Sequence, residues 1–219
     1  MERRVFDNRL HRRWWLGLLL VVVASCDGIY DDPAERWDSD DDAHTFSWVD
    51  ATSYTDWVYI DLTTHTVTAC PYDDSLAQPV SWHIALHRYD VRTNGMAAFE
   101  TDYTSLATLQ YNLQEGRFEL PVEEAFEADV ADSIIIDMST MMDGYLTRAP
   151  SLRNSVLSRW LDVDMRSMPP IYTPSGRVYL LRTADGTTLS LLFTGFTNPR
   201  LHGAKGWISF VFDTVARAD

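Results

Sequence analysis

Apolar and polar residues alternate along most of the chain after residue 46, and this alternation predicts β-strands. The clearest runs are rich in β-branched and aromatic side chains and are separated by turn-forming residues. Because successive side chains of a strand point to opposite faces, a two-residue period fits strands with one buried face. The runs lie at residues 57–62, 64–68, 82–92, 177–182, 187–193 and 206–212.

Turn signals follow these runs at short intervals. Asn94-Gly95 ends one run, and Asp185-Gly186 joins two others in a pattern typical of a tight hairpin, where the turn needs positive φ. Helical periodicity is weak throughout, and only residues 149–158 suggest a turn or two of helix. The pattern therefore predicts one all-β domain, a sandwich or an irregular barrel-like fold, with at most one or two short helices.

The N-terminal part of the chain has a different pattern. Five arginines among the first 13 residues precede eleven largely apolar residues, 14–24. A helix of that length rises about 16 Å, against roughly 30 Å for the hydrocarbon core of a membrane. Residues 1–25 are therefore predicted to be a secretory signal peptide. The segment 23–26, VASC, resembles a bacterial lipobox with Cys26 as the lipidated residue; an ordinary signal peptide with an incidental cysteine is the alternative.

Residues 26–46 are dense in aspartate and poor in aliphatic side chains. Such a segment buries too little apolar surface to offset the entropy of ordering it, so we expect a flexible tether. Acidic residues just after a lipidated cysteine also resemble the export signal of surface lipoproteins. A solvated spacer without an address function is the alternative. The folded domain is then expected over residues 47–219.

Composition narrows the class of protein. The chain has 219 residues, of which 46% are hydrophobic and 23% charged, as in an ordinary folded protein. Its net charge of −14 argues against nucleic acid as a partner, because phosphate binding depends on clustered Lys and Arg. Lys205 is the only lysine. With two cysteines the domain must depend on its core, and we expect Cys70 to be a structural thiol.

Sequence motifs of common enzymes are absent. The chain lacks a Gly-rich phosphate loop, a G-x-S-x-G turn, an HExxH helix and paired CxxC motifs. His83 and His87 lie four residues apart, which on a strand separates them by about 13 Å, so we do not expect a zinc site there. Residue types for a Ser/His/Asp triad are present, but nothing in the sequence positions one. We therefore expect a protein that is not an enzyme.

Residues 81–95, SWHIALHRYDVRTNG, carry a family resemblance. The run resembles the signature of the HmuY-like haem-binding lipoproteins, roughly W-D-[IM]-A-[LF]-H-R-Y-D-V-R-x-N. His83 stands where that family has Asp, while the HRYDVR core at 87–92 is intact. The similarity extends to the Trp57 and Tyr59 strand, to residues 177–186 and weakly to the terminal strand, so it covers most of the domain.

The resemblance implies an all-β haemophore that is lipid-anchored at the outer membrane of a Gram-negative bacterium and exposed on the cell surface. Such a protein takes haem from host haemoproteins and passes it to a TonB-dependent outer-membrane receptor. The signature run itself is expected to be architectural, with alternating aliphatic side chains facing a core. Arg88, Asp90 and Arg92 would form a charge ladder on the other face, and His87 would be a structural histidine.

Axial ligands of haem iron come from His, Cys, Tyr or Met. Founding members of the family use two histidines, from segments near residues 133–142 and 160–168 here. This chain has no histidine between His87 and His202, so those segments cannot supply them. The same stretch instead holds five of the seven methionines, which are Met138, Met141, Met142, Met165 and Met168.

The resemblance places Met165 where the family has its second histidine, after a Trp-Leu-x-x-x pattern that matches residues 160–164. Met138 is the expected first ligand because it has the strand parity of Ile134 and Ile136. Its separation of 27 residues from Met165 resembles that of family members thought to bind haem through paired methionines. Which of the methionines at 138, 141 and 142 is the first ligand stays open.

The other methionines and two tyrosines are expected to surround the haem. Met141, Met142 and Met168 would line the pocket, and Tyr145, Tyr172 and Arg166 would meet the haem edge or its propionates. Methionine is also a common filler of irregular cores, which is the alternative interpretation of the cluster. The alternative functions are a surface adhesin or structural lipoprotein that keeps the fold without haem, or a hydrolase with paired carboxylates in a cleft.

Overall fold

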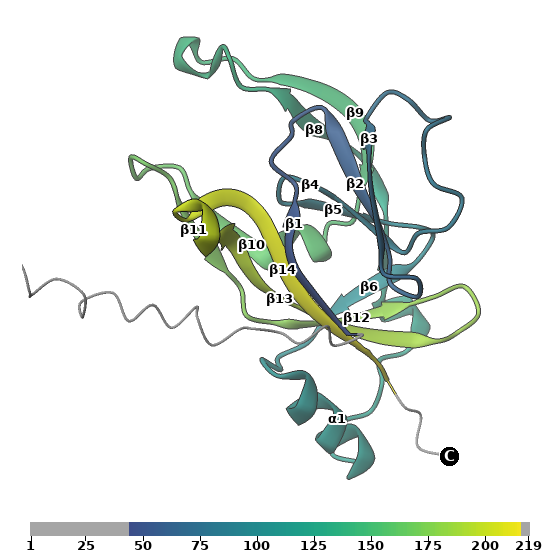
Figure 1. Ribbon diagram of the computed structural model, residues 1–219. Helices are drawn as coiled ribbons and strands as arrows, with labels where there is room; N and C mark the ends of the chain where they lie inside the picture. Colours follow the sequence, from purple (N-terminus) through teal and green to yellow (C-terminus); the bar gives the residue numbers. More distant parts are fainter. Residues whose placement is uncertain (1–43, 216–219) are drawn as a thin grey trace, which may run out of the picture. The chain divides into compact units, whose positions relative to one another are not determined.

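The computed structural model describes residues 44–215 and confirms the all-β fold (Figure 1). The predicted signal peptide, Cys26 and all but the last three residues of the expected tether lie outside the described residues. The first strand begins at Thr45, two residues before the expected start of the domain. Within the described range, no helix combines the length and the apolar composition that crossing a membrane requires.

The larger sheet has six antiparallel strands in the order β1-β14-β13-β12-β6-β7, so its two edges are open. A smaller antiparallel sheet has the order β3-β2-β4-β5. Two further hairpins, β8–β9 and β10–β11, form two-stranded sheets of their own. The strands are β1 (Thr45–Asp50), β2 (Asp56–Asp61), β3 (Thr66–Pro71), β4 (Ile84–His87), β5 (Asp90–Thr93), β6 (Ala97–Glu100), β7 (Glu127–Ala128), β8 (Val130–Asp137), β9 (Thr147–Arg153), β10 (Leu161–Asp164), β11 (Ile171–Pro174), β12 (Val178–Arg182), β13 (Thr188–Asn198) and β14 (Ala204–Thr214).

The main core lies between the two larger sheets. Ile60 and Leu86 of the smaller sheet share one buried cluster with Leu181, Phe193 and Phe210 of the larger sheet. Alternate residues of these strands enter this cluster, and the residues between them face the outer sides of the two sheets, as expected of sheets that pack face to face. The region is therefore a sandwich of two open sheets rather than a barrel.

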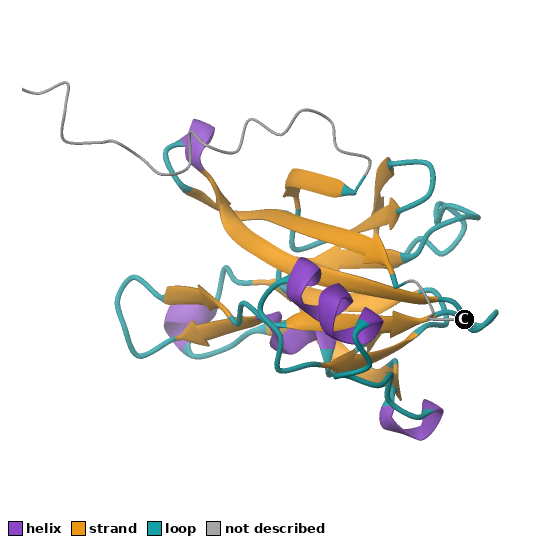
Figure 2. Ribbon diagram, turned by 90° about the horizontal axis from the view of Figure 1, so that it is seen from below, coloured by secondary structure: helices purple, strands orange, loops and turns teal. Residues whose placement is uncertain are grey.

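Both outer faces of this sandwich are covered. The helix α1 (Leu106–Gln114) packs on the larger sheet, where Leu109 joins Val178 and Leu180 in a second buried cluster (Figure 2). On the smaller sheet, Ile134 and Ala149 of the β8–β9 hairpin join a third cluster with its aromatic residues. The order of layers is therefore α1, larger sheet, smaller sheet and β8–β9.

Several sequence-based expectations for single elements are confirmed. Strands occur in all six predicted runs, and β12 and β13 form the hairpin predicted from Asp185-Gly186. Gly186 has φ +85°, the conformation that the Asp-Gly pair was expected to need. Cys70 is buried and its thiol donates to the Ala77 carbonyl at 2.9 Å, so it is a structural thiol as predicted. Burial raises the pKa of this thiol.

Two local predictions were wrong, and one short helix was not located in advance. Residues 82–92 are not one run but the hairpin β4–β5, because Arg88 takes φ +55° and turns the chain. Residues 149–153 belong to β9, and the helical turn comes later as the 3-10 helix η4 (Leu157–Trp160). The helix α1 was missed, although Ser105 caps it by accepting from the Thr108 amide at 3.4 Å.

Candidate functional site

The five candidate methionines occupy the loops of two different hairpins. Met138, Met141 and Met142 lie between β8 and β9, and Met165 and Met168 lie between β10 and β11. Figure 1 shows the β8–β9 and β10–β11 hairpins projecting from the same side of the described domain. Because the hairpins are separate sheets, no two methionines from opposite loops sit side by side on one hydrogen-bonded ladder.

The β8–β9 loop begins where β8 loses its regular register. Pairing is regular up to Ile135 and then shifts before Asp137, which is the last residue of the strand. The expected strand parity of Met138 was therefore wrong: Met138 is half-buried and lies in the turn beyond the strand. Asp137 holds this turn, because its carboxylate accepts from the Ser139 amide at 2.7 Å and from the Ser139 hydroxyl at 2.9 Å.

The rest of this loop is exposed to solvent. It continues through the short 3-10 helix η3 (Met141–Asp143), which ends at Gly144 in the left-handed conformation, φ +82°. The side chain of Met142 is 85% exposed and that of Tyr145 is 72% exposed. Both side chains can therefore contact only a ligand that binds at the surface of the molecule.

The β10–β11 loop has a similar start. Asp164 is the last residue of β10, and its carboxylate accepts from the Arg166 amide and the Ser167 hydroxyl, both at 2.9 Å. These bonds hold the pKa of Asp164 below its usual range. Met165 follows directly and is 55% exposed, while Met168 is 82% exposed.

The two loops therefore share one local design. In each, an aspartate ends the strand, a methionine follows it, and the aspartate caps the amide two residues further on. The backbone amide of Ser139 likewise lowers the pKa of Asp137. Sequence reasoning missed these aspartates, although the segments Asp-Met-Ser and Asp-Met-Arg-Ser, 137–139 and 164–167, are visible in the sequence.

The exposure of the loop methionines argues against the alternative that they fill an irregular core. Met96 is buried in the main core, as a filling methionine is expected to be. Four of the five loop methionines are instead exposed, which is unusual for a side chain that is normally buried. Packing of a core does not account for them.

Tyr172 has a different environment from Tyr145. It lies on β11, half-buried, and its ring packs against Phe196 with centroids 4.9 Å apart. The ammonium nitrogen of Lys205 lies 4.6 Å from the centroid of the same ring. Tyr172 therefore joins the β10–β11 hairpin to the main core, with one side of the ring already covered.

Charged groups join the β8–β9 hairpin to the smaller sheet. Arg153 of β9 pairs with Asp132 across the hairpin and lies 3.5 Å from Asp90 of β5. Burial raises the pKa of Asp90 to about 6, although the positive charge of Arg153 acts in the opposite direction. The base of the β8–β9 hairpin thus contacts the half-buried carboxyl of Asp90.

The expected charge ladder of the signature run is not formed. Arg88 lies in the turn, where its guanidinium is 4.7 Å from the centroid of the Tyr54 ring. Arg92 lies over the Trp57 ring at 4.4 Å and bonds to the Tyr59 hydroxyl. The two arginines therefore pack on different aromatic rings and do not line one face of a single strand.

His87 is a structural histidine, as predicted. It is buried, and its Nε2 donates to the Tyr54 carbonyl at 2.8 Å. Burial lowers the pKa of this imidazole, which favours the neutral form. Within residues 44–215, no three His, Cys, Asp or Glu side chains gather into a group suited to a metal ion.

One Ser/His/Asp group does occur, but its hydrogen bonds are not those of a catalytic triad. Ser81 donates to the Asp61 carboxylate at 2.5 Å, and His83 Nδ1 accepts from the Leu62 amide at 3.1 Å. In a triad the histidine must instead accept from the serine and donate Nδ1–H to the aspartate. The group braces the end of β2 and offers no activated nucleophile.

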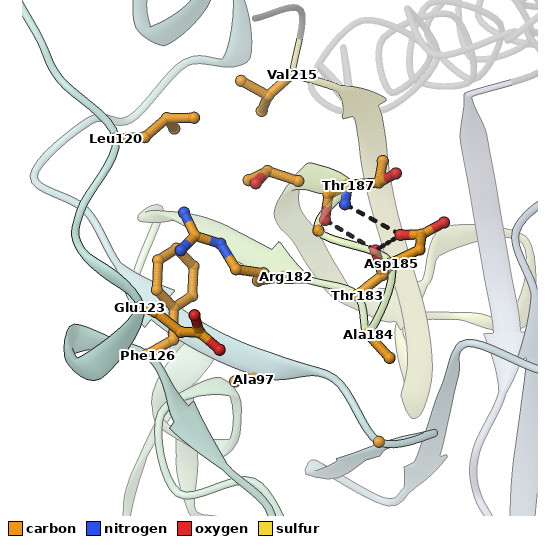
Figure 3. Close-up of a pocket in the computed structure, with 13 residues that line it drawn as sticks. Ala97, Leu120, Glu123, Phe126, Arg182, Thr183, Ala184, Asp185, Thr187 and Val215 are labelled. Atoms are coloured by element: carbon orange, nitrogen blue, oxygen red, sulfur yellow. Dashed lines mark hydrogen bonds between the residues drawn. The ribbon is translucent and has the colours of Figure 1, made fainter.

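A cavity of about 760 Å³ lies at the β12–β13 turn, away from the methionine loops (Figure 3). Its charged residues are Glu123, Arg182 and Asp185. The Arg182 guanidinium already donates to the Pro121 carbonyl at 3.2 Å and lies 4.2 Å over the Phe126 ring. None of the residues that line this cavity is a methionine, histidine, cysteine or tyrosine. It therefore lacks the donors that bind haem iron.

Comparison with known proteins identifies the domain. Residues 53–212 match the family model described as HmuY protein. A solved structure of a candidate HmuY-like haem-binding protein from Bacteroides vulgatus is 36% identical, with a TM-score of 0.66, over 81% of this chain and 94% of that one. A candidate lipoprotein from Bacteroides fragilis is 39% identical, with the same TM-score, over 82% and 93%.

A more distant structure shares the fold. The apo HmuY analog of Tannerella forsythia is 23% identical, with a TM-score of 0.62, over 81% of this chain and all of that one. A search of curated protein sequences found no match.

Proposed function

Because the chain belongs to the HmuY family, we propose that it binds haem non-covalently through its two methionine loops, with Met138 and Met165 as the axial ligands. The donor chemistry supports this proposal. A thioether is a soft, neutral ligand that haem iron accepts, and the described residues carry these donors in exposed loops. In bound haem, the sulfur atoms of Met138 and Met165 would coordinate the iron.

The shared Asp-Met turn is the observation that carries the choice of ligands. Met138 and Met165 occupy the same position in their loops, directly after the capping aspartate of a strand end. Met141 and Met142 lie in η3 and have no counterpart of this kind. The turn fixes the backbone on both sides of the thioether, which reduces the ordering that binding requires.

The neighbouring side chains have supporting roles in this proposal. Met142, Met168 and Tyr145 are exposed in the same loops and cover the porphyrin faces and edge. Tyr172 is half-buried and contributes at the base of the β10–β11 loop. Met141 makes apolar contact with the porphyrin and does not coordinate the iron.

The place of the protein in the cell is part of the same proposal. Cys26 carries the lipid anchor, and the acidic tether holds the domain at the surface of the outer membrane. The domain takes haem from host haemoproteins and passes it to a TonB-dependent receptor, without catalysis. The leader sequence and the similarity to a candidate lipoprotein support this location.

Titration of the purified domain with haem tests the proposal. The wild-type protein is expected to give a Soret band with one haem per chain. Met165→Ala and Met138→Ala are each expected to lose at least about tenfold in affinity, about 1.4 kcal/mol, because each removes an iron ligand. Met141→Ala tests the choice between neighbouring methionines and is expected to stay within about threefold of wild type.

Met96→Leu is the matched control, since it removes a buried thioether outside both loops with little change in volume. Absence of a Soret band in the wild type would favour the structural or adhesive alternative. A loss in Met141→Ala equal to that expected for Met138→Ala would move the first ligand into η3.

A further inference from the structure

Lys205, the only lysine of the chain, lies on β14 beside the β10–β11 methionine loop. Its ammonium nitrogen donates to the Pro170 carbonyl at 2.9 Å. The same nitrogen lies 4.6 Å from the centroid of the Tyr172 ring, within the range of a cation–π contact. One side chain thus contacts the last residue of the loop and the strand that follows it.

The loop is therefore held at both ends by charged side chains. Asp164 caps its start by accepting from the Arg166 amide and the Ser167 hydroxyl. Lys205 binds the carbonyl at its end. Met165 and Met168 lie between these two points and are exposed. The hairpin that carries the loop pairs only with itself, so a bond from β14 is an external support.

Contacts of the next residue, Gly206, hold the backbone at Lys205 in place. Gly206 has φ +92°, and the Arg88 guanidinium occupies the space that a Cβ atom would need there. The Gly206 carbonyl accepts from the Ala51 amide at 2.9 Å, which ties this part of β14 to the segment after β1. Lys205 therefore projects from a backbone that packing on both sides holds in place.

We propose that Lys205 is a positioning residue of the haem site, which holds the β10–β11 loop in the conformation that presents Met165. This inference rests on the proposed function of the two loops. Ordering a loop on binding costs free energy, and a loop that is already ordered avoids that cost. Lys205 acts through the loop backbone and Tyr172, not on the iron.

Two measurements on purified variants test this role. Lys205→Met keeps most of the stem but removes the charge and the donor, while Lys205→Arg keeps both. In the haem-free protein, Lys205→Met is expected to speed hydrogen–deuterium exchange of the amides in residues 165–172. Its haem affinity is expected to be about tenfold weaker than wild type. Lys205→Arg is expected to restore both values.

Arg177→Met is the matched control, because it removes the same charge from a solvent-accessible pair with Asp102, outside both methionine loops. It is expected to leave the exchange and the haem affinity unchanged. The absorption bands of bound haem should be the same in Lys205→Met as in wild type, since both ligands remain.

Two outcomes would overturn the inference. If the amides of residues 165–172 exchange as slowly in Lys205→Met as in the wild type, the contact does not order the loop. Faster exchange with unchanged haem affinity would show that ordering of the loop is irrelevant to binding. A wild-type protein that fails to bind haem is a different result: it overturns the proposed function, whatever the exchange measurement gives.

Discussion

At the scale of single residues, the molecule uses aspartate, glycine and lysine to fix the backbone around the methionines of its two hairpin loops. Asp137 and Asp164 cap the turns that carry the candidate ligands, and Lys205 binds the end of one loop. Gly206 allows the Arg88 guanidinium to approach the strand next to Lys205. These are short contacts between polar groups, and hydrophobic periodicity does not reveal them.

Gly206 gives a stability prediction at this scale. A Cβ atom at residue 206 would collide with Arg88 and Thr52, and φ +92° disfavours any side chain. Gly206→Ala is therefore expected to lower the free energy of unfolding by about 1–3 kcal/mol in urea denaturation.

Gly195→Ala on the neighbouring strand β13 is the control for that prediction. A Cβ atom there meets only Ser209 at 3.9 Å, an ordinary contact. Its expected change is within about 1 kcal/mol, and stabilisation is the favoured sign. Equal losses in the two variants would show that the close approach of Arg88 is not what requires Gly206.

At the scale of elements, each methionine loop is the tip of a hairpin whose base is fastened to the sandwich. The base of β8–β9 is held by Ile134 in the aromatic cluster and by Arg153 beside Asp90. The base of β10–β11 is held by the packing of Tyr172 on Phe196. The tips project from these supports, so the candidate site is built at the ends of elements rather than within a sheet.

The Asp90 carboxyl predicts a pH dependence of stability. Its pKa is about 6 in the folded protein, above the ordinary value of 3.8, so the folded state binds the proton more tightly. The cost of burying the charge is therefore present at pH 7 and declines as pH falls through 6. Asp90→Asn removes this cost, and Arg153 keeps Asp132 as its partner.

Denaturation of wild type and Asp90→Asn at pH 7 and pH 5 measures the effect. The stability of Asp90→Asn relative to wild type is expected to be higher at pH 7 than at pH 5 by about 1–2 kcal/mol. Comparison of the two proteins removes contributions that they share, such as that of His87. A difference between the proteins that does not change with pH would contradict the raised pKa.

The elements also show what the sequence could predict. Alternation and turn chemistry located strands in six runs and the Asp-Gly hairpin, because these depend on local pattern. The lack of a Cys or His partner nearby in the sequence predicted that Cys70 is a structural thiol, and it is buried. The turn at Arg88 escaped prediction because arginine rarely takes positive φ. The prediction that Met138 shares a strand face with Ile134 was wrong because the strand register shifts after Ile135. That shift depends on the pairing with β9, which only the folded structure specifies.

At the scale of the whole molecule, the described domain is a layered support for two projecting loops. The helix α1 and the β8–β9 hairpin cover the outer faces of the two sheets, and the methionine loops remain exposed. The expectation that methionines gather as a ligand cluster came from their spacing and from the missing histidines. Their placement in two hairpins that project to one side needed the structure (Figure 1).

The central claim is that two neutral sulfur atoms bind the iron. Methionine ligation favours reduced iron more than imidazole ligation does. The most direct test is therefore haem titration in dithionite and in air, for wild type and for Met138→His/Met165→His. We predict that wild type binds ferrous haem at least about tenfold more tightly than ferric haem, and that the double variant loses this preference. Equal wild-type affinities in both conditions would contradict the claim.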